Sequence, residues 1–255
     1  MDGSIASGRV SSGRVTPAPA HVAILGLGPS LSAYLDIVKT MGGRSAYCDE
    51  VWAINALGDC VGCDRVFHMD DVRIQEVRAL ARPESNIARM LNWMRRHPGP
   101  IYTSRLHSDY PGLVEYPLEA VINDTGQAYF NSTAAYAVAY AIHLGVKKIS
   151  LHGMDFTYPD AHDAEKGRAC VEFWLGIAHA RGIKISVGRG TTLLDAFVAF
   201  PDRFYGYDTH RVKLTGGEPG AYRVEFVEAE APSAEEIEAR YDHGRHPNAI
   251  VEAST

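Results

Sequence analysis

Short apolar runs alternate with amphipathic segments from His21 onward. The segments with helical spacing are Leu31–Met41, 72–80, 84–96, 130–144 and 164–181. The runs typical of strands are Val22–Gly26, Val51–Ile54, Arg65–His68, Gly99–Tyr102, Lys148–His152 and Ile183–Val187. Strands that alternate with helices form parallel sheets. We therefore predict an α/β protein with a Rossmann-like, mostly parallel sheet and helices on both faces.

The same pattern divides the chain into three parts. Residues 1–20 are small, polar and punctuated by proline, which predicts a disordered leader. Residues 21–205 carry the alternating elements and are expected to form one Rossmann-like domain. In residues 206–255, apolar positions alternate on both sides of a glycine-rich turn at 216–220, and acidic residues follow. We predict a β-hairpin and then an acidic tail, in which Ser233 and Glu236 cap a short helix.

Composition narrows the classes of protein. Hydrophobic residues make up 46% of the 255 residues and charged residues 22%, an ordinary globular mixture. The net charge is −6, and residues 206–255 hold 10 acids and 5 bases, which argues against a nucleic-acid partner. Four cysteines do not suggest a disulfide framework. No apolar run is long enough to span a membrane and no secretory signal is evident, so we expect a cytoplasmic location.

The first predicted strand runs into Gly26-Leu27-Gly28-Pro29-Ser30, and a helix follows. Glycines allow a tight turn and a close approach to a ligand. Pro29 suits a helix start, Ser30 can cap the helix, and the free N–H groups of a helix start favour an anion. The loop is therefore a candidate phosphate site, although it matches neither the Rossmann GxGxxG nor the Walker A pattern. The alternative is a plain strand–helix turn.

Polar residues follow the next two strands. Asn55 can read a base or sugar edge because its amide both donates and accepts hydrogen bonds, but asparagine is also a common turn former. Asp70 and Asp71 can hold Mg²⁺ on a phosphate substrate, or they can cap the helix that starts near Val72. Ligands of parallel sheets bind beyond the carboxyl ends of the strands, where all three residues are expected.

The later strand and helix starts carry further candidates. Small polar residues open the helix near 134 and offer a second anion site. The loop after the strand that ends at His152 contains an acid suited to a sugar or metal contact, and a histidine follows that can act as a general base near neutral pH. These candidates are Asn131, Ser132, Thr133, Gly153, Asp155 and His162.

Four segments, in order, resemble the bacterial lipo-oligosaccharide sialyltransferases, which take sialic acid from CMP-sialic acid. They are Ile24–Ser30, Val51–Asn55, Ser132–Phe156, and His162 followed by Glu172-Phe173. The resemblance covers about residues 22–200, and the long Ser132–Phe156 block is its specific part. The chain also looks like a wider related group, which includes the archaeal 6-hydroxymethylpterin diphosphokinase-like proteins and the flagellin-modifying motility accessory factors.

The resemblance implies a nucleotide-binding transferase domain that uses a CMP-type nucleotide-sugar and a hydroxyl acceptor. His162 would deprotonate the acceptor, and Tyr158 would help the phosphate to leave. The nucleotide would be held by Gly28, Ser30, Asn55, Ser132 and Asp155, and we add Gly26, Pro29, Asp70, Asn131, Thr133 and Gly153 from their positions. No metal and no further cofactor are expected for this reaction. A homo-oligomer is consistent with the resemblance.

The chain departs from the sialyltransferases at several positions. Leu27 stands where they have an asparagine, and the third strand ends in His68-Met69-Asp70, which is more like the diphosphokinase branch. A Mg²⁺-dependent diphosphokinase is therefore one alternative function, and a non-catalytic nucleotide-binding module of phage origin is another. Metal sites built on Cys60 and Cys63, or on His152, Asp155, His162 and Asp163, are weaker alternatives.

Overall fold

The computed structural model describes residues 18–157, 159–207, 209–218 and 221–239. These residues form two compact units that divide between Phe197 and Val198, and each is taken by itself. The strands of the first unit are β1 (His21–Leu25), β2 (Glu50–Ile54), β3 (Arg65–Phe67), β4 (Ile101–Thr103), β5 (Leu113–Glu115), β6 (Lys148–His152) and β7 (Lys184–Val187). Its α-helices are α1 (Leu31–Met41), α2 (Val72–Ala81), α3 (Asn86–Met94), α4 (Leu118–Thr125), α5 (Thr133–His143) and α6 (Ala161–Ala180).

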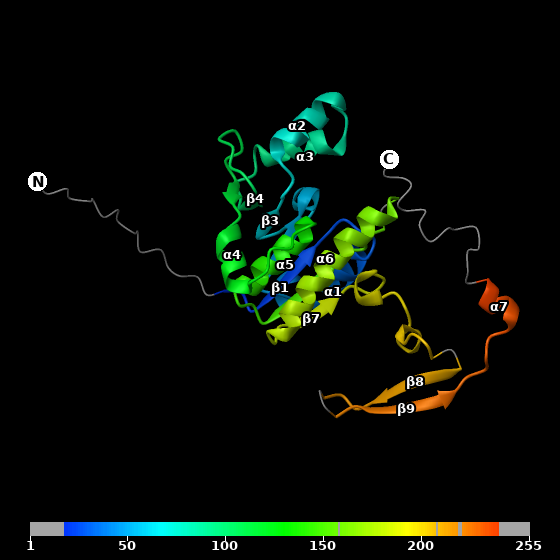
Figure 1. Ribbon diagram of the computed structural model, residues 1–255. Coiled ribbons are helices and arrows are strands. Elements are labelled where there is room, and N and C mark those ends of the chain that lie inside the picture. Colours follow the sequence, from blue (N-terminus) through cyan, green and yellow to red (C-terminus); the bar gives the residue numbers. More distant parts are fainter. Residues whose placement is uncertain (1–17, 158, 208, 219–220, 240–255) are drawn as a thin grey trace, which may run out of the picture. The chain divides into compact units, whose positions relative to one another are not determined.

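The strands of the first unit form one seven-stranded sheet in the order β5-β4-β3-β2-β1-β6-β7, and every neighbouring pair is parallel (Figure 1). Strands β1 to β5 lie side by side in chain order. After β5, the chain passes through α4 and α5, and β6 pairs with the other edge of β1. The strand order therefore reverses between β1 and β6. A ligand crevice is expected at such a reversal, beyond the carboxyl ends of these two strands.

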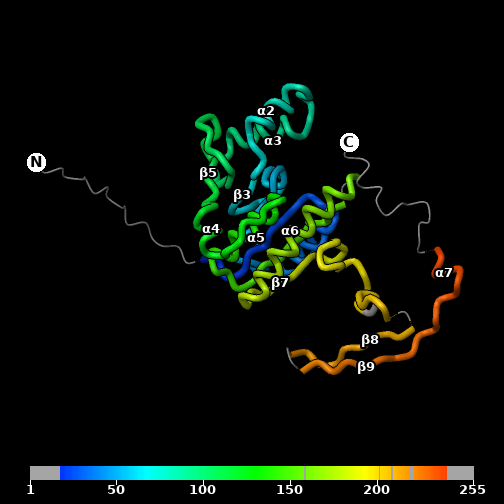
Figure 2. The backbone as a smooth tube through the Cα atoms, viewed as in Figure 1, coloured from blue at the N-terminus to red at the C-terminus, as the bar shows by residue number. Residues whose placement is uncertain are grey.

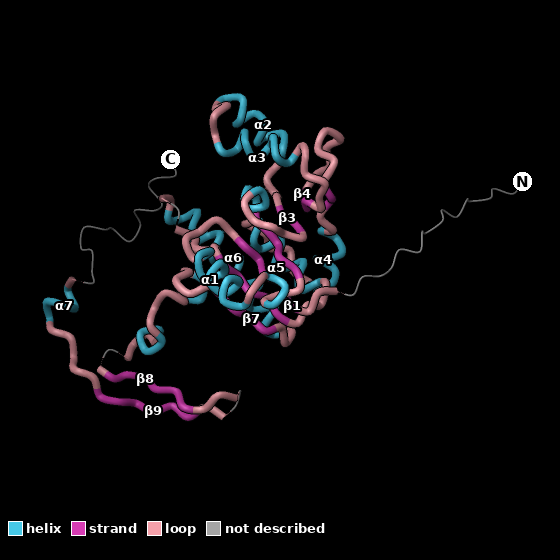
Figure 3. The backbone as a smooth tube through the Cα atoms, turned by 180° about the vertical axis from the view of Figure 1, so that it is seen from behind, coloured by secondary structure: helices cyan, strands magenta, loops and turns pink. Residues whose placement is uncertain are grey.

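Alternate residues of each central strand enter two separate cores. In β1, Val22 and Ile24 belong to the core beneath α4, α5 and α6, and Ala23 and Leu25 belong to the core beneath α1 and α3. All four side chains are fully buried, as in a strand covered on both faces. The strands are the magenta segments between the helices of this unit in Figure 3. The α/β, Rossmann-like prediction is thus confirmed.

The alanines of α5 explain how this helix can lie so close to the sheet. Five alanines along it are buried, and the helix contacts β1, β2 and β3. Figure 1 shows α6 running beside α5. The small side chains bring the N-terminus of α5 close to the strand ends, where the site lies. The alanines that are buried are Ala134, Ala135, Ala137, Ala139 and Ala141.

Sequence reasoning missed one strand and one α-helix, and some helix starts differ from the predicted ones, α6 among them. It had no strand at Leu113–Glu115 and no helix at Leu118–Thr125, because each is short and buries few side chains. The helix predicted from 164 begins at Ala161, since the Asp160 carboxylate caps it by accepting from the N–H groups of His162 and Asp163.

The second unit contains the predicted hairpin, formed by β8 (His210–Thr215) and β9 (Arg223–Glu228). The two strands are antiparallel and run side by side in Figure 2, with Val212 opposite Phe226 and Leu214 opposite Val224. The short helix α7 (Ala234–Glu238) has the predicted capping box between Ser233 and Glu236. The rest of the predicted acidic tail, from 240, and the leader up to 17 lie outside the described residues.

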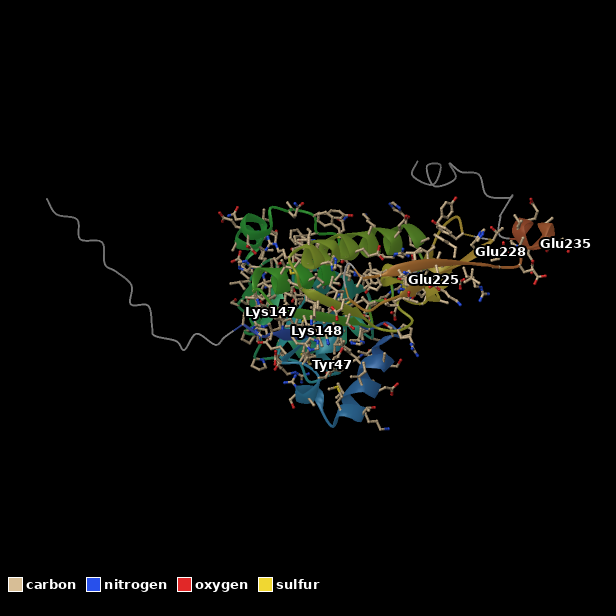
Figure 4. The ribbon with its side chains drawn as sticks, turned by 90° about the horizontal axis from the view of Figure 1, so that it is seen from below. Tyr47, Lys147, Lys148, Glu225, Glu228 and Glu235 are labelled. Atoms are coloured by element: carbon tan, nitrogen blue, oxygen red, sulfur yellow. The ribbon has the colours of Figure 1, made fainter. Side chains whose placement is uncertain are left out.

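Figure 4 labels Tyr47, Lys147 and Lys148 in the first unit, and Glu225 and Glu228 on β9 of the second. The Lys148 ammonium lies 5.7 Å from the centre of the Tyr47 ring. Within the described ranges, none of the helices has the length and apolar character needed to cross a bilayer.

Candidate functional site

A pocket of about 690 Å³ opens where the strand order reverses. Its walls come from the loops after β1, β2, β3 and β6 and from the first turns of α5 and α6. Most of the predicted site residues meet here: Gly26, Gly28, Pro29, Asn55, Asp70, Asn131, Ser132, Thr133, Gly153 and Asp155 all line it. The volume is in the range of small-molecule sites. Segments more than 100 residues apart in the chain thus build one cavity.

The loops after β1 and β6 form the floor of the pocket and are joined by four hydrogen bonds. The Gly26 N–H donates to the His152 carbonyl at 2.8 Å, and the Gly28 N–H donates to the Gly153 carbonyl at 2.8 Å. The Ser30 N–H also donates to Asp155 Oδ2 at 2.6 Å, and in the opposite direction the Gly153 N–H donates to the Ser30 Oγ at 2.8 Å. The loop after β1 and the loop after β6 therefore hold each other in place.

Glycine is required in this floor for space. A Cβ on Gly26 would collide with the Gly153 carbonyl oxygen, and a Cβ on Gly153 would collide with the Gly26 carbonyl oxygen. Gly153 also has a φ of +71°, which L-residues rarely adopt. A Cβ on Gly28 would meet the Asp155 carboxylate. These glycines therefore bring two loop backbones into contact.

The expected cap at Ser30 is wrong. Its side chain makes no capping hydrogen bond to α1, and its hydroxyl accepts from the Gly153 N–H instead. The side chain is buried and does not line the pocket. The physical reason is that the Ser30 backbone is helical, with φ −66° and ψ −3°, whereas a capping serine is normally extended; its hydroxyl bridges the two loops instead.

Asp155 is the most constrained acid of the pocket. Only 5% of its surface is exposed, and its Oδ2 is occupied by the Ser30 N–H. Its Oδ1 is buried and has no hydrogen-bond partner among the described residues. A buried carboxylate oxygen without a donor is costly unless something supplies one. Asp155 is also one of the residues that line the pocket.

The adjacent aspartates after β3 take different roles. Asp71 caps α2, because its carboxylate accepts from the Arg73 N–H at 2.8 Å and the Ile74 N–H at 3.4 Å. Asp70 is exposed and lines the pocket. Asp71 is thus the helix cap, and Asp70 is the member of the pair that lines the cavity.

The turn after β2 directs Asn55 toward the pocket. Its φ of +53° is a left-handed conformation that asparagine tolerates better than most residues. Its Oδ1 lies 3.0 Å from Nδ1 of His68, a side chain with only 1% of its surface exposed. Asn55 therefore forms the turn and also contributes an amide to the pocket wall.

The start of α5 supplies backbone donors. Ser132 caps the helix, and its hydroxyl accepts from the Ala135 N–H at 3.3 Å, as the small polar residues at this position indicated. The first N–H groups of a helix have no acceptor within it, and the helix dipole makes this end attractive to anions. Thr133 and Ala134 occupy these first positions and line the pocket.

The first turns of α6 add the cation that sequence reasoning missed. Asp163, Lys166 and Gly167 line the pocket from one face of α6. Lys166 gives no signal of its own in the sequence, because it stands in the charged segment 163–168, where a lysine is typical of a solvated surface. Lys166 is the one lysine or arginine among the described residues that line the pocket.

Of the two predicted catalytic residues, the structure describes His162. His162 lies inside the first turn of α6, not before the helix as expected, because of the Asp160 cap. It is exposed and stands one turn before Lys166 on the same face of the helix, which places it at the rim of the pocket rather than in its lining. Tyr158 lies outside the described residues.

We expect the protein to lose stability in acid because His152, at the end of β6, is buried. Its ring is 2% exposed, and burial lowers its pKa from 6.5 to about 4, with His21 and Lys148 acting in the same direction. Between about pH 6.5 and pH 4, the His152 ring is protonated in the unfolded chain but stays neutral in the native protein. The free energy of unfolding therefore falls as the pH is lowered through this range. We expect this group alone to remove about 2 to 3 kcal/mol between pH 7 and pH 4.5.

Urea denaturation at these two pH values measures this loss. His152→Gln can keep a hydrogen bond to the Tyr47 hydroxyl, which lies 2.9 Å from His152 Nε2, and has no titrating ring. The variant should lose correspondingly less stability on acidification. An equal acid loss in the variant and in the parent protein would contradict the assignment.

Among residues 18–157, 159–207, 209–218 and 221–239, no group of three or more His, Cys, Asp or Glu side chains is placed to hold a metal ion. The weaker alternative of a site built on His152, Asp155, His162 and Asp163 is therefore not formed. Cys60 and Cys63 are free thiols, the first exposed and the second half-buried.

Comparison with known proteins gives a limited set of similarities. No family model and no curated protein sequence matches the chain. The chain is similar to structures of the sialyltransferase CstII from Campylobacter jejuni. The complex with CMP is 20% identical with a TM-score of 0.42, over 71% of this chain and 84% of that one. The complex with CMP-3FNeuAc is 19% identical with a TM-score of 0.44, over 86% and 97%.

Proposed function

We propose that the protein is a glycosyltransferase that takes a sugar from a CMP-type nucleotide-sugar and transfers it to an acceptor hydroxyl. The observation that carries the proposal is the pocket at the strand reversal, which unites ten of the residues expected to bind the nucleotide. The order of the motifs, above all the Ser132–Phe156 block that resembles the sialyltransferases, selects the donor class.

The anionic part of the donor would lie between α5 and α6. The first N–H groups of α5, near Thr133 and Ala134, favour a phosphate or carboxylate, and Lys166 reaches the same cavity from α6. Phosphate is a dianionic or monoanionic group that accepts several hydrogen bonds at once, and a helix start with a lysine supplies them. Charge that develops on the leaving phosphate would be stabilised at the same place.

The hydroxyl-bearing part of the donor would lie over the floor. Asp155 lines a cavity floored by glycine backbone, and its buried Oδ1 has no hydrogen-bond donor among the described residues. A ribose or sugar hydroxyl fits this need, because it donates to the carboxylate and its ring can rest close to a surface without side chains. The pocket thus offers hydrogen-bond donors at the starts of α5 and α6 and a carboxylate acceptor, Asp155, at its floor.

In the transfer step, the acceptor oxygen attacks the anomeric carbon of the donor sugar. The bond from this carbon to the phosphate oxygen breaks, and the nucleotide leaves with the electron pair. His162, at the rim beside Lys166, would take the proton of the acceptor hydroxyl. Sialic acid is the sugar that the motif resemblance favours.

Calorimetric titration with CMP tests the binding half of the proposal. We expect the protein to bind CMP without added metal, and we expect Lys166→Met to bind it about tenfold more weakly, because it loses a charge-assisted hydrogen bond. Lys39→Met is the matched control, since Lys39 is exposed on α1 and does not line the pocket.

Three outcomes would revise the proposal. Equal affinities of the Lys166 and Lys39 variants would remove Lys166 from the site. Binding of ATP only in the presence of Mg²⁺, with no response to CMP, would favour the diphosphokinase alternative, in which Asp70 would serve the metal. Tight CMP binding with no turnover of any CMP-sugar would favour the non-catalytic module.

A further inference from the structure

We propose that His68 is a positioning residue that fixes the amide of Asn55, so that the pocket presents an N–H donor at this point and selects a ligand with an acceptor there. The inference rests on the proposed function for the identity of the ligand, but the contact between the two side chains stands by itself. His68 follows the end of β3, and Asn55 follows the end of β2, the neighbouring strand.

The chemistry of the contact assigns the proton. An amide oxygen can only accept, so the Nδ1 of His68, 3.0 Å from Asn55 Oδ1, must carry the hydrogen and donate it. Burial lowers the pKa of His68, while Asp70 opposes this shift, so the ring is neutral near pH 7. A neutral ring with its proton on Nδ1 has a bare Nε2. That nitrogen is buried and has no hydrogen-bond partner in the part of the chain that the structure describes.

The same contact fixes which end of Asn55 remains for a ligand. The Oδ1 is engaged by His68, so the NH₂ group is the part of this side chain that is left to bind in the pocket. The backbone of Asn55 is held in its turn conformation at φ +53°, which limits the directions that the side chain can take. An NH₂ group in this place favours a carbonyl, carboxylate or phosphate oxygen on the ligand and disfavours an ammonium group.

This role differs from simple packing because His68 is a poor choice for a purely structural position. A buried imidazole with one unpaired nitrogen is less favourable than an apolar side chain of similar size. His68 does not line the pocket, so it does not act on the ligand directly. We infer that His68 acts through one hydrogen bond, which orients the side chain of Asn55.

The experiment has one readout that needs no ligand. Long-range proton–nitrogen NMR correlations of the His68 ring distinguish the two neutral forms. We expect the form with hydrogen on Nδ1 and a bare Nε2. The opposite form would overturn the proposal, because Asn55 Oδ1 would then face a nitrogen without a hydrogen. This result stands whether or not CMP binds.

The second readout is the affinity for CMP in three variants. His68→Leu removes the donor, and we expect at least a tenfold loss of CMP affinity with no loss of thermal stability. His68→Asn can place an N–H near the position of Nδ1 and should stay within about threefold of the parent. Asn55→Asp can still accept from His68 but replaces the NH₂ by an oxygen, and it should bind at least tenfold more weakly.

The two proposals fail in different ways. If the parent protein does not bind CMP while the Nδ1–H form is observed, the proposed function fails and the positioning role is retained. If the parent binds CMP and His68→Leu binds equally well, the positioning role fails and the proposed function is retained. A parallel loss of affinity and of stability in both His68 variants would mean that the residue is only structural, and would also overturn the role.

Discussion

Replacing Gly153 by alanine is expected to destabilise the protein by roughly 3 kcal/mol or more. Two effects add at this position. The φ of +71° is unfavourable for any residue with a Cβ, by about 1 to 2 kcal/mol. The new Cβ would also collide with the Gly26 carbonyl oxygen and lie 3.2 Å from Leu31 Cβ, and such overpacking typically costs another 1 to 3 kcal/mol. The free energy of unfolding in urea measures the sum.

Gly145 provides a matched control for this substitution. Its φ of +70° is nearly the same, but a Cβ there would meet nothing within 4 Å. Gly145→Ala should therefore show only the backbone effect, about 1 to 2 kcal/mol. The difference between the two variants isolates the contact between the loops. Equal losses in both variants would show that the close approach of Gly153 to Gly26 does not matter for stability.

Replacing His162 by alanine is expected to reduce sugar transfer by 10² to 10⁴-fold, the usual contribution of a positioned general base. The rate of CMP release from CMP-sialic acid, in the presence of a panel of oligosaccharide acceptors, is the quantity to measure. CMP affinity should remain within about twofold of the parent value, because the exposed ring of His162 does not line the pocket. A change in turnover without a change in binding is the signature of a base that acts on the acceptor.

His179 serves as the control for the His162 variant. It is also an exposed histidine of α6, but it lies in the last turn of the helix, far along the sequence from the pocket residues. His179→Ala should retain the activity of the parent. If His162→Ala turns over the donor as fast as His179→Ala, another group deprotonates the acceptor.

The fold could be predicted because its strands are covered on both faces. Runs such as Val22–Leu25 are uniformly apolar, and such runs separated by amphipathic helices are typical of a buried parallel sheet. The elements that escaped prediction carry little of this signal. In β5, two of three residues are exposed, and α4 buries only Val121. Short elements at the margin of a sheet are defined by pairing with a neighbour, which a single sequence does not display.

The site could be predicted in its position but not in its hydrogen bonding. The rule that ligands bind beyond the carboxyl ends of parallel strands was enough to select Gly28, Asn55 and Asp155. It could not show that Asp155, 125 residues later, accepts from the Ser30 N–H, because this bond depends on β6 being placed beside β1. Lys166 was missed because a lysine in the charged segment 163–168 carries no signal of its own, and it is recognised only once α6 is placed beside the pocket.

The hydrogen bonds between the loops after β1 and β6 have a consequence for protein engineering. Residues 26–30 resemble a self-contained strand–helix loop that could be moved into another scaffold, but the N–H groups of Gly26, Gly28 and Ser30 find their acceptors in residues 152–155. A graft of the first loop alone would leave these donors unpaired and would remove the glycine backbone against which it rests. Any chimaera with a related protein must therefore exchange both loops together, and a crossover point between residues 30 and 152 separates partners that depend on each other.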